Sequence, residues 1–298
     1  MNLRELDFPV RVYWDITPAP YNVTADYLRI CDDIAESKIL NLNLSDTGIT
    51  FSRSCIEILE KLRNKKIAVS LTISNSALDN AGIALFSDLN VRALFIEVNS
   101  LHELQLSIGK IKSSPKASMS LGISYVAGRK NYQDLPEVLT FCLDNEIEYL
   151  VLPMQRLIKA EECFYVNKNE REELSARLNK INHEGMKLII HDPFLWRAFY
   201  PSAQFPAGGC QAANSMIYIS LEGAVYPCPS MPVKLGDLNG STLKQLLLSD
   251  FKKEIRQKLL TPPAGCFSCK ELNHCMGGCR GRAYVLKGSL MESDPACM

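Results

Sequence analysis

The sequence predicts an α/β protein in which an open, partial barrel of parallel strands precedes a small cysteine-rich domain. Up to residue 192, short β-rich runs alternate with segments whose apolar residues recur at helical spacing. Such repeated strand–helix units require parallel strands joined by helical crossovers. The alternation ends at 192–210, where Pro, Gly and aromatic residues take over. We therefore expect two domains, residues 1–195 and 196–298.

Seven β-rich runs are the expected barrel strands, and they are too few for a complete eightfold barrel. Their nearly continuous apolar character is typical of strands that are buried on both faces. After the second run, Ile56, Leu59 and Leu62 recur at helical spacing, and Ser52 is expected to cap that helix. The expected strands are residues 10–16, 39–45, 67–74, 92–98, 118–126, 149–154 and 187–192.

The second domain begins with a predicted hairpin and a predicted helix. In "SMIYISLEGAVYPC", two β-rich runs flank a Glu-Gly turn. The stretch "STLKQLLLSDFKKEIRQKLL" follows and predicts one helix, capped by Ser241 or Thr242. The tail beyond it has little regular pattern.

Composition excludes several classes of partner. The chain holds 33 basic and 33 acidic residues, so no overall field favours nucleic acid or a membrane surface. The N-terminus has no apolar signal region, and no run approaches the ~18 apolar residues of a membrane span. We expect a cytoplasmic protein, in which 11 cysteines indicate metal or redox chemistry rather than disulfides.

Seven of these cysteines gather after residue 209. Thiolates two or three residues apart can face one metal centre, and Gly277 and Gly278 allow the chain to fold tightly around it. Zinc takes four ligands, and so does each cubane iron–sulfur cluster, so seven thiolates are one short of two complete sites. The seven are Cys210, Cys228, Cys266, Cys269, Cys275, Cys279 and Cys297.

This layout, with Gly223 separated by four residues from Cys228, resembles the SPASM domain of peptide-modifying radical SAM enzymes. The resemblance implies two auxiliary [4Fe–4S] clusters. Cys266, Cys269, Cys275 and Cys297 would bind the second auxiliary cluster, and Cys210, Cys228 and Cys279 the first. No cysteine precedes Cys210 closely, so one iron of the first cluster would be open or bound by a non-cysteine group, with Cys163 as a remote candidate.

The N-terminal part resembles the radical SAM barrel, a partial TIM-like (β/α)6 barrel, in its strand–helix order. The three-cysteine loop that holds that family's catalytic cluster is missing, since Pro18, Pro20 and Tyr21 follow "WDIT". The family's Gly-Gly-Glu-Pro turn is replaced by "LSDTGIT". The chain thus resembles the SPASM domain protein of GeoRSP-type peptide-modification systems, and we expect it neither to bind nor to cleave S-adenosylmethionine.

The resemblance implies an iron–sulfur accessory protein that assists a radical SAM/SPASM enzyme on a peptide by relaying electrons, docking the substrate, or both. Its expected partners are that enzyme and the peptide or its chaperone. One alternative is an independent enzyme that uses the open iron of the first cluster. Another is a zinc-stabilised interaction module without redox activity. We expect the docking face to include Arg280 and Arg282, which could equally balance the charge of the clusters.

Other residues are weaker candidates, and none is assigned a catalytic role. His191 and Asp192 close the last barrel strand, where barrels of this kind place functional groups, although strand-end hydrogen bonding is the simpler explanation. His274 could tune a cluster by hydrogen bonding to sulfur, or could simply be exposed. The remaining cysteines and histidines are expected to pack in the core or lie on the surface: Cys31, Cys55 and Cys142, then His102 and His183.

Overall fold

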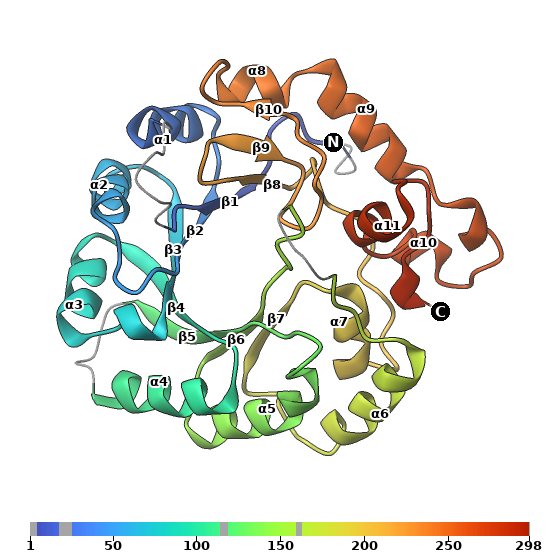
Figure 1. Ribbon diagram of the computed structural model, residues 1–298, viewed down its shortest axis with the longest axis horizontal. Helices are drawn as coiled ribbons and strands as arrows, with labels where there is room; N and C mark the ends of the chain where they lie inside the picture. The colour runs from blue at the N-terminus through green and yellow to red at the C-terminus, as the bar shows by residue number, and fades with distance from the viewer. Residues whose placement is uncertain (1–4, 18–25, 114–118, 159–162, 298) are drawn as a thin grey trace.

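A computed structural model describes residues 5–17, 26–113, 119–158 and 163–297. One sheet of ten strands, in the order β10-β9-β8-β1-β2-β3-β4-β5-β6-β7, curves into a ring that helices surround (Figure 1). The ring is open, because the described residues of β7 and β10 pair on one side only. This confirms the predicted α/β partial barrel with a distinct C-terminal region.

Strands β1 to β7 are parallel, and each is followed by a helix along the chain. Ser52 caps α2 as predicted, since its side chain accepts a hydrogen bond from the Cys55 amide. The strands are β1 (Arg11–Asp15), β2 (Asn41–Asp46), β3 (Ala68–Ser74), β4 (Val91–Val98), β5 (Ser120–Tyr125), β6 (Tyr149–Leu152) and β7 (Lys187–Ile190). The helices are α1 (Tyr27–Glu36), α2 (Arg53–Leu62), α3 (Asn80–Asp88), α4 (Leu101–Ser113), α5 (Leu135–Asp144), α6 (Lys168–Leu178) and α7 (Pro193–Phe199).

The expectation that the strands are apolar on both faces is wrong for the inner face. In β1, Val12 and Trp14 are fully buried beneath the helices, whereas Arg11 and Tyr13 line a cavity inside the barrel. Strands β2 and β3 alternate in the same way. The helices therefore cover a continuous apolar surface, while the lumen is lined by polar side chains.

The C-terminal region extends the same sheet. The predicted hairpin forms β8 (Met216–Ile219) and β9 (Ala224–Tyr226), and β8 lies parallel to β1. The predicted single helix over 241–260 is wrong: Thr242 caps a short α8 (Leu243–Leu247), and Ser249 caps a separate α9 (Asp250–Leu260). The remaining elements are β10 (Gly236–Asp237), α10 (Leu272–Cys275) and α11 (Arg280–Lys287).

One hydrophobic core runs through the barrel and the C-terminal region, with residues on both sides of position 195. The division into residues 1–195 and 196–298 stays a prediction. Cys31, Cys55 and Cys142 are fully buried in that core, as expected for structural cysteines. His102 is exposed, and His183 is partly buried against Phe199. Among the described helices, none is long and apolar enough to cross a membrane.

Candidate metal centres

The cysteine-rich tail folds as short helical turns that place several thiols close together. Cys266 ends a 3-10 turn, Cys275 ends α10, and Cys279 is the N-cap of α11. Gly278, between the last two, has φ +72, and a Cβ atom there would lie 2.6 Å from Cβ of Asp294. A side chain at this position would therefore force the loop away from the segment that carries Cys297.

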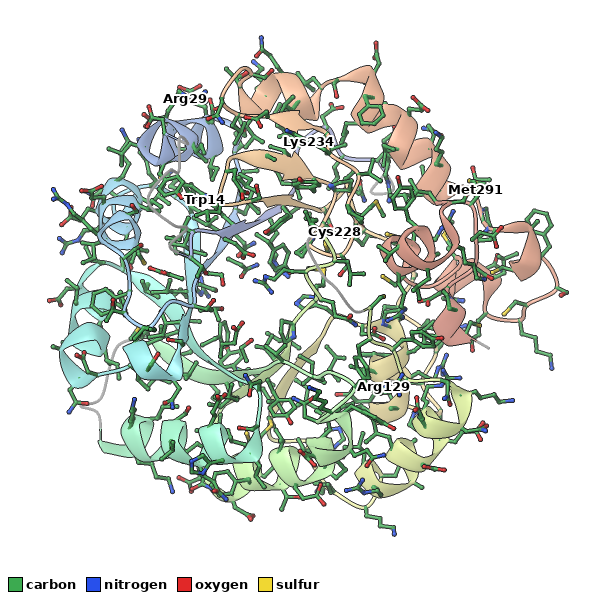
Figure 2. All side chains as sticks on the ribbon, in the orientation of Figure 1. Trp14, Arg29, Arg129, Cys228, Lys234 and Met291 are labelled. Carbon is green, nitrogen blue, oxygen red and sulfur yellow. The ribbon has the colours of Figure 1, made fainter. Side chains whose placement is uncertain are left out.

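The first group of thiols, Cys210, Cys228 and Cys279, lines one cavity of ≈ 250 Å³ between the C-terminal region and the ends of β6 and β7, and Cys275 of the second group lines the same cavity. The hairpin turn at Gly223, with φ +81, leads into β9, and Cys228 follows that strand. Cys228 lies on the inner side of the C-terminal region (Figure 2). Burial raises the pKa of its thiol, and the negative charges of Cys210 and Cys279 raise it further.

The second group comprises Cys266, Cys269, Cys275 and Cys297. A 3-10 turn over Pro295–Cys297 brings the last thiol back to the others, with the Cys297 amide donating to the Asp294 carbonyl at 3.1 Å. Burial raises the pKa of Cys266, and Cys297 and Cys269 add to this rise. The pKa of Cys275 is about 11, because of burial and, to a smaller extent, Cys297. Cys269 and Cys297 are exposed, so this group lies at the surface.

These donors suit an iron–sulfur cluster in kind and arrangement. Thiolates are soft ligands that select zinc, copper(I) or iron–sulfur clusters over hard cations. A zinc ion binds four sulfur atoms directly, each at ≈ 2.3 Å. In a [4Fe–4S] cluster, each thiolate binds a different iron atom. Within the described ranges, no three Cys, His, Asp or Glu side chains are close enough to hold one metal ion.

Three arginines are buried beneath the cysteine groups. Arg256, Arg280 and Arg282 are each no more than 1 % exposed. Arg280 donates to the carbonyl oxygens of Leu290 and Thr261, and the negative charges of Cys210 and Cys266 both act on its pKa, which burial lowers. Arg280 thus lies between the two groups.

The prediction of a docking face that includes Arg280 and Arg282 is therefore wrong, because neither side chain reaches the surface. Arg282 pairs instead with Asp294, at 2.7 Å, and with Asp192. Their burial beside thiolates agrees with the alternative, that these cations balance negative charge at the cysteine groups.

His191 and Asp192 have separate roles. Asp192 caps α7 by accepting from the amides of Phe194 and Leu195, and its pKa is lowered because the Arg282 guanidinium outweighs the effect of burial. His191 lines the walls of two cavities, the one at the first cysteine group and another inside the barrel. Burial, with the positive charges of Arg11 and Arg156, lowers its pKa to about 4, so its imidazole is neutral at neutral pH.

Two further candidates lie near the first cysteine group. Cys163 is partly buried, and the charges of Arg282, Asp294 and Asp192 act on its pKa, as they do on that of Cys279. His274 lines the cavity of the first group, and its Nδ1 atom lies 3.3 Å from Nε2 of Gln204. Within the described residues, neither side chain hydrogen-bonds to a cysteine sulfur, and the assignment of Cys163 as a ligand and of His274 as a tuning residue stays a prediction.

At the carboxyl ends of the first strands, the described side chains bind one another. The Thr47 amide donates to Thr17 Oγ1 at 3.1 Å, and the Ser52 amide donates to the Asp46 carboxylate at 2.6 Å. These bonds fix the turn between β2 and α2, and the replacement of the family's Gly-Gly-Glu-Pro sequence at this turn stays a prediction. The preceding loop, with Pro18, Pro20 and Tyr21, lies outside the described residues.

Sequence reasoning missed the ion pairs that support the site. Arg156 binds both carboxylate oxygens of Asp15, at 2.8 and 3.0 Å, and Tyr218 donates to the same carboxylate at 2.9 Å. Asp294 accepts from the Cys279 amide at 2.7 Å. No local spacing predicts these contacts, because Asp15 and Arg156 are 141 residues apart.

Comparison with known proteins identifies both parts of the molecule. Residues 210–270 match the family model of the SPASM iron–sulfur cluster-binding domain. The fold is that of Streptococcus suis SuiB bound to S-adenosylmethionine, with a TM-score of 0.73 at 17% identity over 99% of this chain and 78% of that one. The structure of anSMEcpe with bound AdoMet gives 0.70 at 15% identity over 97% and 94%. The chain is therefore a radical SAM-type partial barrel followed by a SPASM region.

Curated relatives extend the similarity in sequence. The chain is 23% identical to the PqqA peptide cyclase of Granulibacter bethesdensis over 304 residues, which cover 92% of this chain and 78% of the cyclase. It is 29% identical to the AdoMet-dependent heme synthase of Methanosarcina barkeri over 93 residues, or 30% of this chain and 26% of the synthase. SuiB and anSMEcpe were solved with this cofactor bound, and the heme synthase is named as AdoMet-dependent. That this chain does not bind the cofactor stays a prediction.

Proposed function

We propose that this chain is an iron–sulfur accessory protein that carries two [4Fe–4S] clusters and assists a radical SAM enzyme in modifying a peptide. The observation that carries the proposal is the gathering of seven cysteines in the C-terminal region: four line one cavity (Cys210, Cys228, Cys275 and Cys279), Cys266 is partly buried, and Cys269 and Cys297 are exposed. Cys210, Cys228 and Cys279 would hold the first cluster. The second would be held by Cys266, Cys269, Cys275 and Cys297.

Bound clusters of this type supply one-electron transfer at a potential set by charge, hydrogen bonding and exposure. The residues of the chain supply those three factors differently at the two sites. Arg280 places a buried cation between the groups, and the Arg282 amide donates to the Cys279 sulfur at 3.4 Å. Cys269 and Cys297 are exposed, which favours the second site as the point of electron exchange with a docked protein.

A peptide context is supported by the relatives. One is a PqqA peptide cyclase, and SuiB was also solved bound to the precursor peptide SuiA, a structure that matches this chain with a TM-score of 0.71. An accessory rather than catalytic role is supported by the loop that follows Thr17, because residues 18–30 contain no cysteine to hold a third cluster.

The accessory role can be tested by reconstituting peptide modification with and without this chain. We would co-express a radical SAM/SPASM enzyme from the same gene neighbourhood with its precursor peptide, and add the wild type, a Cys269→Ala/Cys297→Ala variant, or Cys142→Ala as a matched control. Modification, followed by mass spectrometry, should require the wild type or the control and fail with the double variant. Complete modification without this chain, together with no co-purification, would refute the accessory role.

A specific observation also favours an independent enzyme as second candidate. A cluster held only by Cys210, Cys228 and Cys279 would have one iron free to bind a substrate, and these thiols line a cavity of ≈ 250 Å³ that Cys275 also lines. This candidate predicts that a substrate-sized ligand changes the electron paramagnetic resonance spectrum of the first cluster alone. Cys210→Ala should abolish that change, whereas Cys269→Ala should leave it intact.

A further inference from the structure

The barrel lumen holds its own cavity of ≈ 230 Å³, and its walls combine polar and charged side chains with an apolar patch of Ala93, Phe95 and Val151. Barrels of this kind usually fill the lumen with layers of branched apolar side chains. Here the side chains leave the centre of the ring open (Figure 2). Small or polar residues occupy inward positions on β2, β3 and β5: Asn41, Asn43, Ser70, Thr72, Ser120 and Ser124. Core packing does not require such a surface, whereas a polar ligand does.

A cation from the first strand projects its charge into this lumen. Arg11 lines the cavity and donates to the Tyr13 hydroxyl at 3.3 Å. In the part of the chain that the structure describes, no carboxylate lies within ion-pair distance of Arg11. Its charge reaches the interior, because it helps to lower the pKa of His191. An arginine without a counterion is suited to bind an anion through its planar fork of donors.

A second cation reaches the cavity through an irregularity in β4. By strand alternation Ala93, Phe95 and Glu97 face the lumen, and Arg92 should face the helices. The pairing with β3 is broken at this point, since Val69 pairs with Val91 but Ser70 pairs with Ala93. Arg92 is the extra residue of this bulge, and it lines the cavity although the residue as a whole is exposed to solvent. Bulges re-aim side chains in this way and are frequent beside functional sites.

Among the described residues, the opposite end of the lumen carries no surplus positive charge, because its one guanidinium lies near two carboxylates. There the Arg156 guanidinium is bound by both oxygens of Asp15, and Glu97 lies near enough to raise the pKa of Arg156 further. The surplus positive charge is therefore confined to the half of the lumen nearest the amino ends of the strands.

We propose that the lumen binds a small anionic molecule whose carboxylate or phosphate group lies between Arg11 and Arg92. The cavity is smaller than the ~300 Å³ at which pockets for drug-sized ligands begin, so the ligand is the size of a small metabolite. The site lies in the amino-terminal half of the barrel, whereas catalytic sites of such barrels lie at the carboxyl ends of the strands. His191 and Met154 line both cavities, so the first cysteine group borders the carboxyl-end half of the lumen, opposite the proposed anion site.

The proposal can be tested on the full chain by isothermal titration calorimetry with inorganic phosphate and, separately, succinate at constant ionic strength. At least one probe should bind with saturation and a stoichiometry of one. Arg11→Met and Arg92→Met should each weaken that binding about tenfold or more, because each removes a charged hydrogen-bond donor. Preference for one probe identifies the anionic group.

Arg63→Met is the matched control, because Arg63 is exposed and does not line the cavity. Arg63 lies near the same end of β4, where its carbonyl oxygen accepts a hydrogen bond from the Asn90 side chain. It should bind the probe as the wild type does, and circular dichroism should show all three variants folded. The absence of saturable binding of both probes would overturn the proposal, and so would unchanged binding by Arg11→Met and Arg92→Met. Because the lumen is formed without cysteine ligands, the result does not depend on cluster content.

Discussion

Arg282 and Asp192 form a buried ion pair that joins the C-terminal region to the end of the last barrel strand. The same guanidinium binds both oxygens of Asp294, each at 2.7 Å. Asp192 caps α7, and Asp294 accepts from the amide of Cys279. One buried cation therefore fixes three segments around a candidate ligand of the first cluster.

Arg282→Met should destabilise the protein strongly. The substitution keeps most of the side-chain volume but leaves two buried carboxylates, Asp192 and Asp294, without their cation. Breaking a buried ion pair in this way costs about 3–5 kcal/mol. Urea denaturation of the cluster-free chain at neutral pH measures the loss.

The control for this prediction is Arg53→Met, because Arg53 pairs with Glu57 in solvent and its side chain is 91% exposed. That change should shift the free energy of unfolding by less than about 1 kcal/mol. If the two variants unfolded at the same urea concentration as the wild type, the ion pair would not hold the segments together.

The two-site arrangement predicts a specific loss of iron. After anaerobic reconstitution the wild type should contain roughly eight iron and eight sulfide per chain. Cys266→Ala/Cys269→Ala/Cys275→Ala should remove about half of the iron, and so should the triple variant at Cys210, Cys228 and Cys279. Iron and zinc are measured together by mass spectrometry, with Cys142→Ala as a control that keeps the wild-type content.

Other outcomes of the iron measurement are equally informative. Complete loss of iron in either triple variant would indicate one shared site. Zinc in place of iron, with no broad absorbance near ~400 nm in anaerobically prepared protein, would support the zinc-stabilised module instead.

Gly278→Ala should disturb the cysteine loop. The new Cβ atom would lie 2.6 Å from Cβ of Asp294. In addition, an alanine held at φ +72 carries backbone strain of about 1–2 kcal/mol. We expect a lower midpoint of thermal unfolding and lower iron content. Gly109→Ala, in α4 with nothing within 4 Å of its Cβ position, should instead stabilise the chain by about 0.5–1 kcal/mol. Equal behaviour of both variants would contradict the close packing at Gly278.

The sequence predicted what depends on local pattern. Strand–helix alternation yields the barrel, and cysteine spacing yields the SPASM assignment, which the family model for residues 210–270 supports. The break between α8 and α9 was missed because the apolar pattern runs on, although Ser249 is a capping residue.

Contacts between distant residues could not be predicted. The sequence predicts a surface position for Arg282, because charged residues are rarely buried without a partner. Its partner Asp192 lies 90 residues away, so the sequence alone does not reveal the ion pair. The polar lumen was missed for the same reason. The alternation in β2 and β3 is visible in the sequence, but only the curvature of the sheet shows that the inward faces surround one cavity.

The last prediction is that the chain does not cleave S-adenosylmethionine reductively. That reaction needs a cluster with an open iron near the end of the first strand, and residues 17–30 contain no cysteine to hold one. Cys31 cannot substitute, because its thiol is fully buried in the core and burial raises its pKa to about 12. The reconstituted, reduced chain incubated with the cofactor should yield no more 5′-deoxyadenosine by chromatography than a protein-free sample, with an active radical SAM enzyme as positive control. Steady production, retained in both triple cysteine variants, would mean that other residues hold a third cluster and that the barrel is catalytic.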